Sequence, residues 1–408
     1  MRLKRSINLV FYTLRILHIP CKSDVVYCGI MANTGTRDEL QNEHGMAHLL
    51  EHLFFKGTKK RTQYQVMNCL ETVGGELNAY TTKEETVVYS IVLKRDFSRA
   101  VDLIMDVIFN STINEEELLK EKEVVKDEID SYLDAPAESI VDDLEEVLFD
   151  GFSLGRNILG TKDSLDIITS EKLIDFYKRC YTTDELVFFS MGDFTQSYVE
   201  KLVNKYLLPV DTTIREFKRT IPLEYSPKKL EIKRNTTQMH YVIGGRAPSI
   251  AEKEKYAFFL LNNILGGPNM TSKLNLSLRE KNALVYQVDS QYQTYSDTGL
   301  WYVYLGTDHE DFKKAKRLAY KEIDKLVQSK ISQTLLSRSK RQIVGQVYLA
   351  QENRESTILS SVKQYLTFNQ VSEIDETIEK YMAISAEEIL DVAQKYFIKE
   401  QLSEIIYL

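Results

Sequence analysis

Long apolar runs, prolines, cysteines and histidines are all scarce in this sequence of 408 residues, which has seven prolines, four cysteines and six histidines. The most hydrophobic N-terminal stretch, residues 9–19, is interrupted by Arg15 and followed by Pro20. It is shorter than the roughly 20 apolar residues that cross a bilayer, so we expect no membrane-spanning segment. The cysteines form no CxxC pair, so we expect reduced, packed thiols at Cys21, Cys28, Cys69 and Cys180.

We also expect no targeting signal in the N-terminal region. Residues 1–6 are basic and precede an apolar stretch, but no small-residue cleavage site follows them. Residues 8–20 instead have the composition of a first β-strand. We therefore expect neither export nor a mitochondrial presequence, and we expect a cytoplasm-like compartment.

Excess positive charge is absent, because the net charge is −8. No basic stripe with interleaved aromatic residues offsets this, so we expect no nucleic-acid partner. The acidic residues are concentrated in residues 115–150. This segment contains fifteen acidic residues and three lysines, so its local charge is −12. One segment therefore makes the whole chain acidic.

The chain divides near its middle into two similar halves. Three prolines fall in the polar stretch 209–227, which has the character of a linker between a domain at 1–208 and a domain at 228–408. In each half a β-rich run leads to a helical pattern, HLLEH at 48–52 and FLLNN at 259–263. This similarity suggests a duplicated fold in which only the first copy kept its chemistry.

Periodicity predicts both strands and helices in each half. Alternating or continuous apolar runs predict strands at 87–93, 186–192 and 300–306. Helical spacing predicts further elements at 96–109, 115–149, 171–180, 196–207, 310–328, 334–352 and 386–397. The fold class expected is α+β, with a layer of sheet against helices used twice.

Three of the six histidines lie within HGMAHLLEH at 44–52. On a helix, His48 and His52 lie one turn apart on one face, and Glu51 is close to that face. Two imidazoles can hold a zinc ion, and a neighbouring carboxylate that is not a ligand can take a proton from the zinc-bound water. The order H-x-x-E-H is an inverted zinc-protease signature, although an amphipathic helix with histidines at the edge of a core would look the same over five residues.

A third ligand would have to come from elsewhere in the chain. On one continuous helix His44 would lie about 12 Å from His52 along the axis, which is too far for one ion, and Gly45 looks like the start of the helix. The acidic stretch at 115–131 offers carboxylates, most of which should form a solvated face. Glu121 and Glu128 share one face there, and the pattern alone does not choose between them.

Taken together, several motifs resemble the pitrilysin/insulinase family of zinc peptidases, and especially its shorter members, mitochondrial processing peptidase and its bacterial homologues. The motif HGMAHLLEHLFFKGT is followed, 76 positions after His52, by Glu128 in EKEVVKDEI. The resemblance covers the whole chain and includes GGELNAYTTKEETVVYS, ILGTKDSL and LGGPNMTSKLNLSLREKNALVY. The long glycine-rich loop of the noncatalytic processing-peptidase subunit is replaced by the short LGGPNMTS.

The resemblance implies a role for each matching residue. It makes His48, His52 and Glu128 the ligands of one Zn²⁺ per chain, Glu51 the general base and Glu121 an assisting carboxylate. It further implies that Asn78 and Ala79 lie along the substrate peptide. Arg279 and Tyr286 from the second half would bind the substrate and stabilise the oxyanion. These roles come from the family and not from the spacing of the residues.

The resemblance also implies an architecture and a function. Chains of this size look like half of a clam-shaped chamber, so we expect a homodimer that cleaves extended or unfolded peptides, including leader or presequence peptides. We expect basic peptides to be favoured by the acidic segment at 115–150, and a bacterial cytoplasmic protein rather than a mitochondrial one. The alternatives are a noncatalytic peptide-binding or scaffolding subunit, and a catalytic subunit that needs a different partner chain.

Overall fold

The computed structural model describes residues 14–207, 213–223, 225–234 and 236–408. They form two compact units that are not continuous in sequence. The first unit combines the chain up to Val125 with residues 158–218 and 358–371, and the second combines residues 126–157, 219–357 and 372–408. No helix in the described part of the chain is long and apolar enough to cross a membrane.

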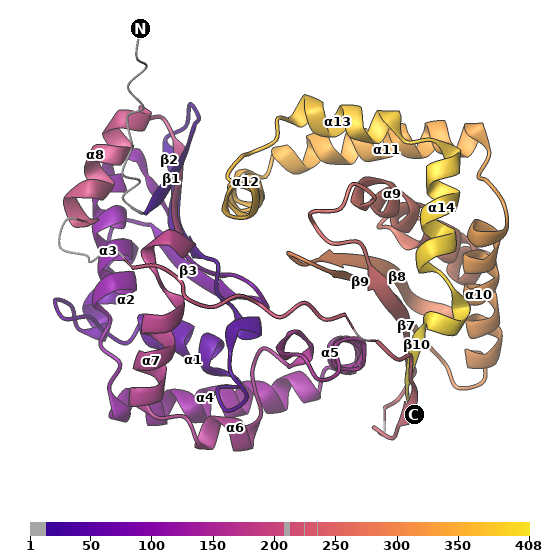
Figure 1. Cartoon of the computed structure of the whole chain (residues 1–408), viewed down its shortest axis with the longest axis horizontal. Coiled ribbons are helices and arrows are strands. Elements are labelled where there is room, and N and C mark those ends of the chain that lie inside the picture. Colours follow the sequence, from indigo (N-terminus) through magenta and orange to yellow (C-terminus); the bar gives the residue numbers. More distant parts are fainter. Residues whose placement is uncertain (1–13, 208–212, 224, 235) are drawn as a thin grey trace, which may run out of the picture. The chain divides into compact units, whose positions relative to one another are not determined.

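The first unit, which contains β1, β2 and β3 in Figure 1, is built on a five-stranded sheet. The strand order in this sheet is β1-β5-β2-β4-β3. Strand β1 is parallel to β5, and every other neighbouring pair is antiparallel. Strand β3 lies at one edge of this sheet. The strands are β1 (Arg15–Pro20), β2 (Val25–Ala32), β3 (Glu76–Thr81), β4 (Thr86–Leu93) and β5 (Leu186–Gly192).

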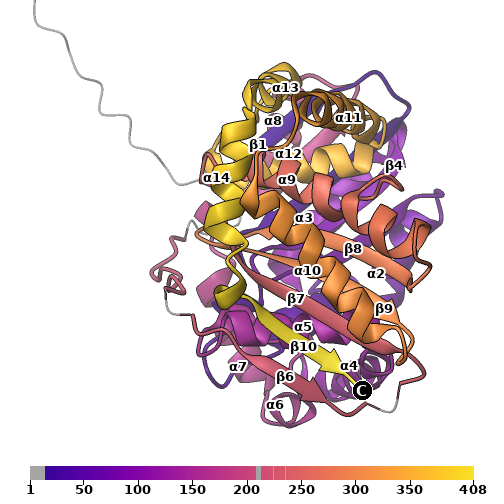
Figure 2. The same cartoon turned by 90° about the vertical axis from the view of Figure 1, so that its right-hand side faces the viewer.

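The second unit repeats this topology with the order β6-β10-β7-β9-β8 (Figure 2). Here β6 is parallel to β10, and the remaining pairs are antiparallel. The identical order confirms two homologous sheet-and-helix domains, and thus the expected α+β class. The strands are β6 (Lys229–Ile232), β7 (Met239–Ala247), β8 (Val285–Thr294), β9 (Gly299–Thr307) and β10 (Ser403–Tyr407).

Helices complete both units. The first unit contains α1 (Met46–Phe54), α2 (Gln63–Glu71), α3 (Phe97–Asn110), α6 (Lys162–Asp166), α7 (Ser170–Cys180), α8 (Gln196–Leu207) and most of α12 (Arg354–Phe368). The second contains α5 (Pro136–Leu148), α9 (Lys255–Gly266), α10 (Phe312–Gln328), α11 (Gln333–Gln351), α13 (Ile374–Ala383) and α14 (Ala386–Tyr396). Helix α4 (Glu115–Leu133) contains the boundary between the units.

Each unit receives one helix from the other half of the sequence. In the first unit, Ile358, Val362 and Leu366 of α12 pack on the face of the sheet that carries alternate residues of β4 and β5. In the second unit, Ile140, Leu144 and Leu148 of α5 form a core with residues of β7 and β10. Because these residues are almost fully buried, the two exchanged helices belong to the cores of their units.

The predicted elements agree with the structure except in a few places. The helix expected over 115–149 is wrong, because the chain forms α4 and then α5, which begins at Pro136. Proline cannot donate the helical hydrogen bond and disfavours helical geometry in the residue before it. Pattern reading also missed the helices α2, α6, α12 and α13 and the strands β6, β8 and β10.

Two predictions fall partly on residues that the structure does not describe. The first strand expected over 8–20 begins at Arg15, and residues 8–13 lie outside the described residues. In the expected linker, 213–223 and 225–227 contain no helix or strand, whereas 209–212 and 224 lie outside the described residues. The domain limits 1–208 and 228–408 stay predictions. All four cysteines are free thiols, but only Cys28 and Cys180 are buried, whereas Cys21 and Cys69 are half-buried.

Candidate metal and active site

Helix α1 presents the histidine motif, and its start depends on Gly45. This glycine has φ of 93°, in the left-handed region that other residues seldom adopt, and it directly precedes the helix. A carboxylate of Glu39 accepts hydrogen bonds from the amides of Gly45 and Ala47 at 3.1 and 2.8 Å. These bonds satisfy amides that the first turn of a helix leaves unpaired, and the negative charge suits this end of the helix.

The apolar residues of α1 are completely buried, which fixes the direction of its polar face. Met46, Ala47, Leu49, Leu50, Leu53 and Phe54 have no exposed surface. The other three positions of the helix carry the two histidines and Glu51. The expectation that His44 lies outside the helix agrees with its position before Gly45.

His48 and His52 from α1 and Glu128 from α4 form a candidate metal site. One possible ligand atom from each residue lies within 4.8 Å of the others. In the described part of the chain, this is the one group of three or more histidine, cysteine or acidic residues found close enough to hold an ion. The structure thus brings together the three residues that the family resemblance implied, although α4 alone had left Glu121 and Glu128 as alternatives.

The donor set of these three residues fits zinc. Two imidazoles and one carboxylate are ligands typical of catalytic zinc sites. Donors that each bind zinc at about 2.0–2.1 Å lie at most about 4 Å apart, so small side-chain adjustments would suffice. Burial and the neighbouring His52 lower the pKa of His48 to about 4, so that His48 is neutral near pH 7, as a metal ligand must be.

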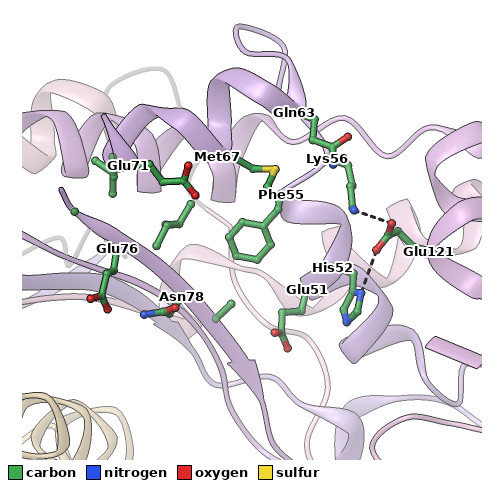
Figure 3. A pocket seen from close by; sticks show the side chains of 14 residues that line it. Glu51, His52, Phe55, Lys56, Gln63, Met67, Glu71, Glu76, Asn78 and Glu121 are labelled. Atoms are coloured by element: carbon green, nitrogen blue, oxygen red, sulfur yellow. Dashed lines mark hydrogen bonds and ion pairs between the residues drawn. The ribbon is translucent and has the colours of Figure 1, made fainter. Parts of the chain in front are cut away.

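Glu121 is a buried carboxylate that contacts α1 through two side chains. Its Oε2 lies 3.1 Å from Nδ1 of His52, and its Oε1 lies 2.7 Å from Nζ of Lys56 (Figure 3). If the neutral His52 donates from Nδ1, its Nε2 keeps the lone pair that a cation needs. The structure therefore places Glu121 where it can orient His52, while its assisting role stays a prediction.

Glu51 contacts the sheet as well as facing the site. Its Oε2 accepts a hydrogen bond of 2.5 Å from the hydroxyl of Thr81, the last residue of β3. Glu51 is partly buried, and it lines a cavity together with His52 and Glu121. The carboxylate is therefore held beside the histidine motif while it remains open to this cavity.

The cavity has a volume of about 640 Å³ and lies between α1, α2 and the edge strand β3. Asn78 and Ala79 of β3 line it, as do Phe55 and Met67. Figure 3 shows Glu51 and His52 at one end of this cavity and Glu71 and Glu76 towards the other. Two of the predicted substrate-contacting residues, Asn78 and Ala79, therefore line the same cavity as the predicted base.

Arg279 and Tyr286 belong to the second unit. Arg279 lies in a short π-helix over Asn275–Glu280 and is exposed, while Tyr286 of β8 has an exposed fraction of 64%. The hydroxyl of Tyr286 is 3.5 Å from a carboxylate oxygen of Asp308. Their roles toward a substrate stay predictions.

Sequence reasoning missed two residues of this site. Lys56 and Thr81 were not singled out, although Lys56 lies only four residues after His52, just beyond the end of α1. On α4, between Glu121 and Glu128, Val125 is buried and Val124 is 48% exposed. Glu121 is buried, whereas Glu128 is exposed.

Comparison with protein families gives two matches along the chain. A family model described as Insulinase (Peptidase family M16) matches residues 17–162. A second model, described as Peptidase M16 inactive domain, matches residues 168–343. The candidate metal site therefore lies within the first match, and Arg279 and Tyr286 lie within the second.

Bacterial proteins that are named as zinc proteases are similar to this chain. YmxG from Bacillus subtilis (strain 168) is 31% identical over 381 residues, which cover 93% of this chain and 92% of YmxG. A protein from Rickettsia bellii (strain RML369-C) is 28% identical over 406 residues, 99% of this chain and 96% of that protein. Both are named uncharacterized zinc protease.

Solved structures share the fold at low sequence identity. A protease from Helicobacter pylori superposes with a TM-score of 0.89 at 20% identity, covering 97% of this chain and 98% of the other. A peptidase M16 inactive domain from Pseudomonas fluorescens gives a TM-score of 0.90 at 17% identity, covering 97% and 95%. These likenesses agree with the two sheet-and-helix domains.

Proposed function

Because this chain belongs to the insulinase family of peptidases (peptidase family M16), we propose that it is a zinc-dependent metalloendopeptidase that cleaves extended or unfolded peptides. The observation that carries the proposal is the convergence of His48, His52 and Glu128 next to a carboxylate, Glu51, that faces a cavity. A noncatalytic domain would need neither this donor set nor the adjacent base. The names of the relatives agree with the choice of metal.

Each residue of the site has a separate task in the proposed reaction. His48, His52 and Glu128 would hold zinc, which when bound polarises the scissile carbonyl and lowers the pKa of a water molecule. Glu51 takes the proton from that water and passes it to the leaving amine. Glu121 keeps the ring of His52 in one orientation by accepting from its Nδ1.

The substrate peptide is proposed to add to the free edge of β3. An extended peptide held by backbone hydrogen bonds at a sheet edge tolerates many side chains, which suits an enzyme for unfolded chains. Asn78 and Ala79 would contact this peptide, and both line the cavity. For Arg279 and Tyr286 we keep the implied roles, in which the guanidinium binds a peptide carbonyl and the phenol stabilises the developing oxyanion.

We propose a homodimer for the assembly and a bacterial cytoplasm for the location. Two chains that each form half of a clam-shaped chamber would admit flexible peptides and exclude folded proteins. Leader-peptide processing and general peptide clearance both fit this description. Size-exclusion chromatography, with activity measured across the peak, tests the homodimer: activity that appears only after a second protein is added would favour the alternative of a different partner chain.

Replacing Glu51 with Gln tests the reaction directly. We expect Glu51→Gln to keep one zinc per chain and to lose cleavage by roughly 10³-fold or more, because the amide cannot take the proton of the water. The measurement pairs metal content with cleavage of an internally quenched, unstructured peptide of about 20 residues.

Two results would overturn this proposal. Full activity of Glu51→Gln would remove Glu51 from the role of the base. A wild-type chain that binds zinc but cuts no peptide would instead favour the noncatalytic, scaffolding alternative, since the metal would then be present without turnover.

We also propose that basic peptides are preferred substrates, because residues 115–150 carry a local charge of −12. Attraction between this segment and a basic peptide should raise kcat/KM and should weaken as salt screens the charges. Cleavage of matched basic and acidic peptides at several ionic strengths measures this effect. Equal rates for both peptides, or rates that are independent of salt, would reject the preference.

A further inference from the structure

The hydroxyl group of Thr81 is in direct contact with the proposed base. Its Oγ1 donates a hydrogen bond to Oε2 of Glu51 over 2.5 Å. Thr81 ends β3, whereas Glu51 lies on α1, thirty residues away in sequence. Hydrogen bonds to an ionised carboxylate are shorter and stronger than those between neutral groups, so this contact restrains the side chain of Glu51.

The chemistry of the carboxylate sets the direction of this hydrogen bond, and a second hydroxyl group lies beside it. Thr86 lies opposite Thr81 in the β3–β4 pair, and their hydroxyl oxygens are 3.4 Å apart. The hydroxyl of Thr86 donates to the carbonyl oxygen of Thr34 over 2.9 Å. Because a hydroxyl has one proton and an ionised carboxylate only accepts, Thr81 directs its own proton to Glu51.

The turn that follows Thr81 is anchored by buried charges. Arg37 and Glu84 form an ion pair of 2.6 Å, and both side chains are almost fully buried. On the next residue, Glu85 pairs with Lys363 of α12 at 2.5 Å. The amide of Thr82 donates to the carbonyl of Glu85 over 2.8 Å. These contacts hold the end of β3, and therefore the hydroxyl of Thr81, in one place.

We propose that Thr81 is a positioning residue that holds the carboxylate of Glu51 in the orientation needed to accept the proton of the attacking water. The inference rests on the proposed function and deepens it. One strand would then do two things, since Asn78 and Ala79 of β3 line the substrate cavity while Thr81 orients the base. Correct seating of the peptide and correct placement of the base would depend on the same rigid element.

Three variants test this proposal on the full-length, zinc-loaded protein. Thr81→Val keeps the shape of the side chain but removes the hydroxyl, and we expect kcat to fall roughly 10- to 100-fold with KM nearly unchanged, since a misplaced group costs rate rather than binding. Thr81→Ser keeps the hydroxyl and should stay within about threefold of wild type. Thr307→Val is the matched control, because Thr307 is a buried strand threonine whose hydroxyl donates to the carbonyl of Leu284, far from Glu51 in sequence.

Two further readouts separate positioning from a general loss of structure. Zinc content and the midpoint of thermal unfolding should be similar for Thr81→Val and Thr307→Val, while only Thr81→Val loses kcat. In crystal structures, the Glu51 side chain should hold one rotamer in wild type and more than one in Thr81→Val. This second readout does not depend on turnover.

The possible outcomes distinguish the role of Thr81 from the proposed peptidase function. Unchanged kcat in Thr81→Val, a loss carried by KM, or a Ser variant as slow as the Val variant would overturn the role of Thr81 while leaving the peptidase function standing. Absence of any cleavage by wild type would overturn the proposed function, and the positioning role with it.

Discussion

The two histidines of α1 are prepared for a metal in different ways. His48 is almost fully buried, and burial together with the nearby His52 lowers its pKa to about 4. His52 is more exposed and is held by Glu121, which also pairs with Lys56. Burial therefore keeps one ring neutral, while a hydrogen bond orients the other.

Removing Glu121 should weaken the metal site without destroying it. We expect Glu121→Ala to lower zinc affinity about 10- to 100-fold, because the ring of His52 loses the partner that orients it and Lys56 loses its counter-charge. Competition with a chelator measures the affinity. Glu123→Ala, an exposed glutamate on the same helix, is the control and should bind zinc as wild type does. Equal affinities for the two variants would contradict the orienting role.

Strand β10 connects several elements of the second unit through one buried carboxylate. Glu404 is 2% exposed, and it accepts hydrogen bonds of 2.8 Å from the hydroxyls of Tyr241 and Tyr320. It also pairs with Lys229 and Lys316. Strands β6, β7 and β10 and helix α10 are therefore joined at one residue.

The ionisation of Glu404 predicts a pH dependence of stability. Burial alone would raise its pKa, but the bonds from two lysines and two tyrosines outweigh burial and lower the pKa from 4.5 to about 2. Because the folded-state pKa is the lower one, the stabilisation is complete above about pH 4.5 and is lost as the pH falls toward 2. Glu404→Gln should therefore lower the free energy of unfolding by about 2–4 kcal/mol at pH 7 and by progressively less below pH 4.5.

Urea unfolding at pH 7, 4.5 and 3 measures this difference between wild type and Glu404→Gln. Glu400→Gln, at an exposed position shortly before β10, controls for the loss of one negative charge. A difference that stays constant with pH would show that the ionised form of Glu404 is not what stabilises the unit.

At the scale of the whole molecule, the exchange of α5 and α12 links the two halves of the sequence. Helix α5 comes from the first half but packs in the core of the second unit, and α12 comes from the second half but packs in the first. In each half, one apolar face of the sheet would therefore stay uncovered if the other half did not supply a helix. A division of the chain at the linker would separate both helices from their cores.

Fragments cut at the linker should therefore fold poorly. We expect fragments 1–208 and 228–408 to lack a cooperative thermal transition, since 1–208 lacks α12 and 228–408 lacks α5. Near-ultraviolet circular dichroism during heating measures this. Fusing residues 134–151 in front of 228–408 is the matched comparison and should restore much of the transition. A sharp transition of the unfused 228–408 would show that α5 is dispensable.

Periodicity and composition were sufficient to predict the repeated α+β architecture. Strands β5, β7 and β9 are apolar along most of their length, and α8 and α10 have a clear helical period, so local spacing reveals them. The break between α4 and α5 was missed, although Pro136 is visible in the sequence. The partners of α5 and α12 were not predictable, because an amphipathic helix shows that it has an apolar face but not which sheet will cover it.

The candidate site likewise has a part that the local sequence predicts and a part that depends on tertiary packing. His48, Glu51 and His52 are recognisable from the sequence because helical spacing places residues three and four apart on one face, a local geometry that needs no tertiary information. The candidate third ligand and the contact between Thr81 and Glu51 join residues that are 76 and 30 positions apart, and only the packing of α4 and β3 against α1 makes them neighbours. Local chain geometry thus determines the histidine motif, whereas burial of apolar faces between distant segments decides which carboxylate lies beside the two histidines and what contacts the proposed base.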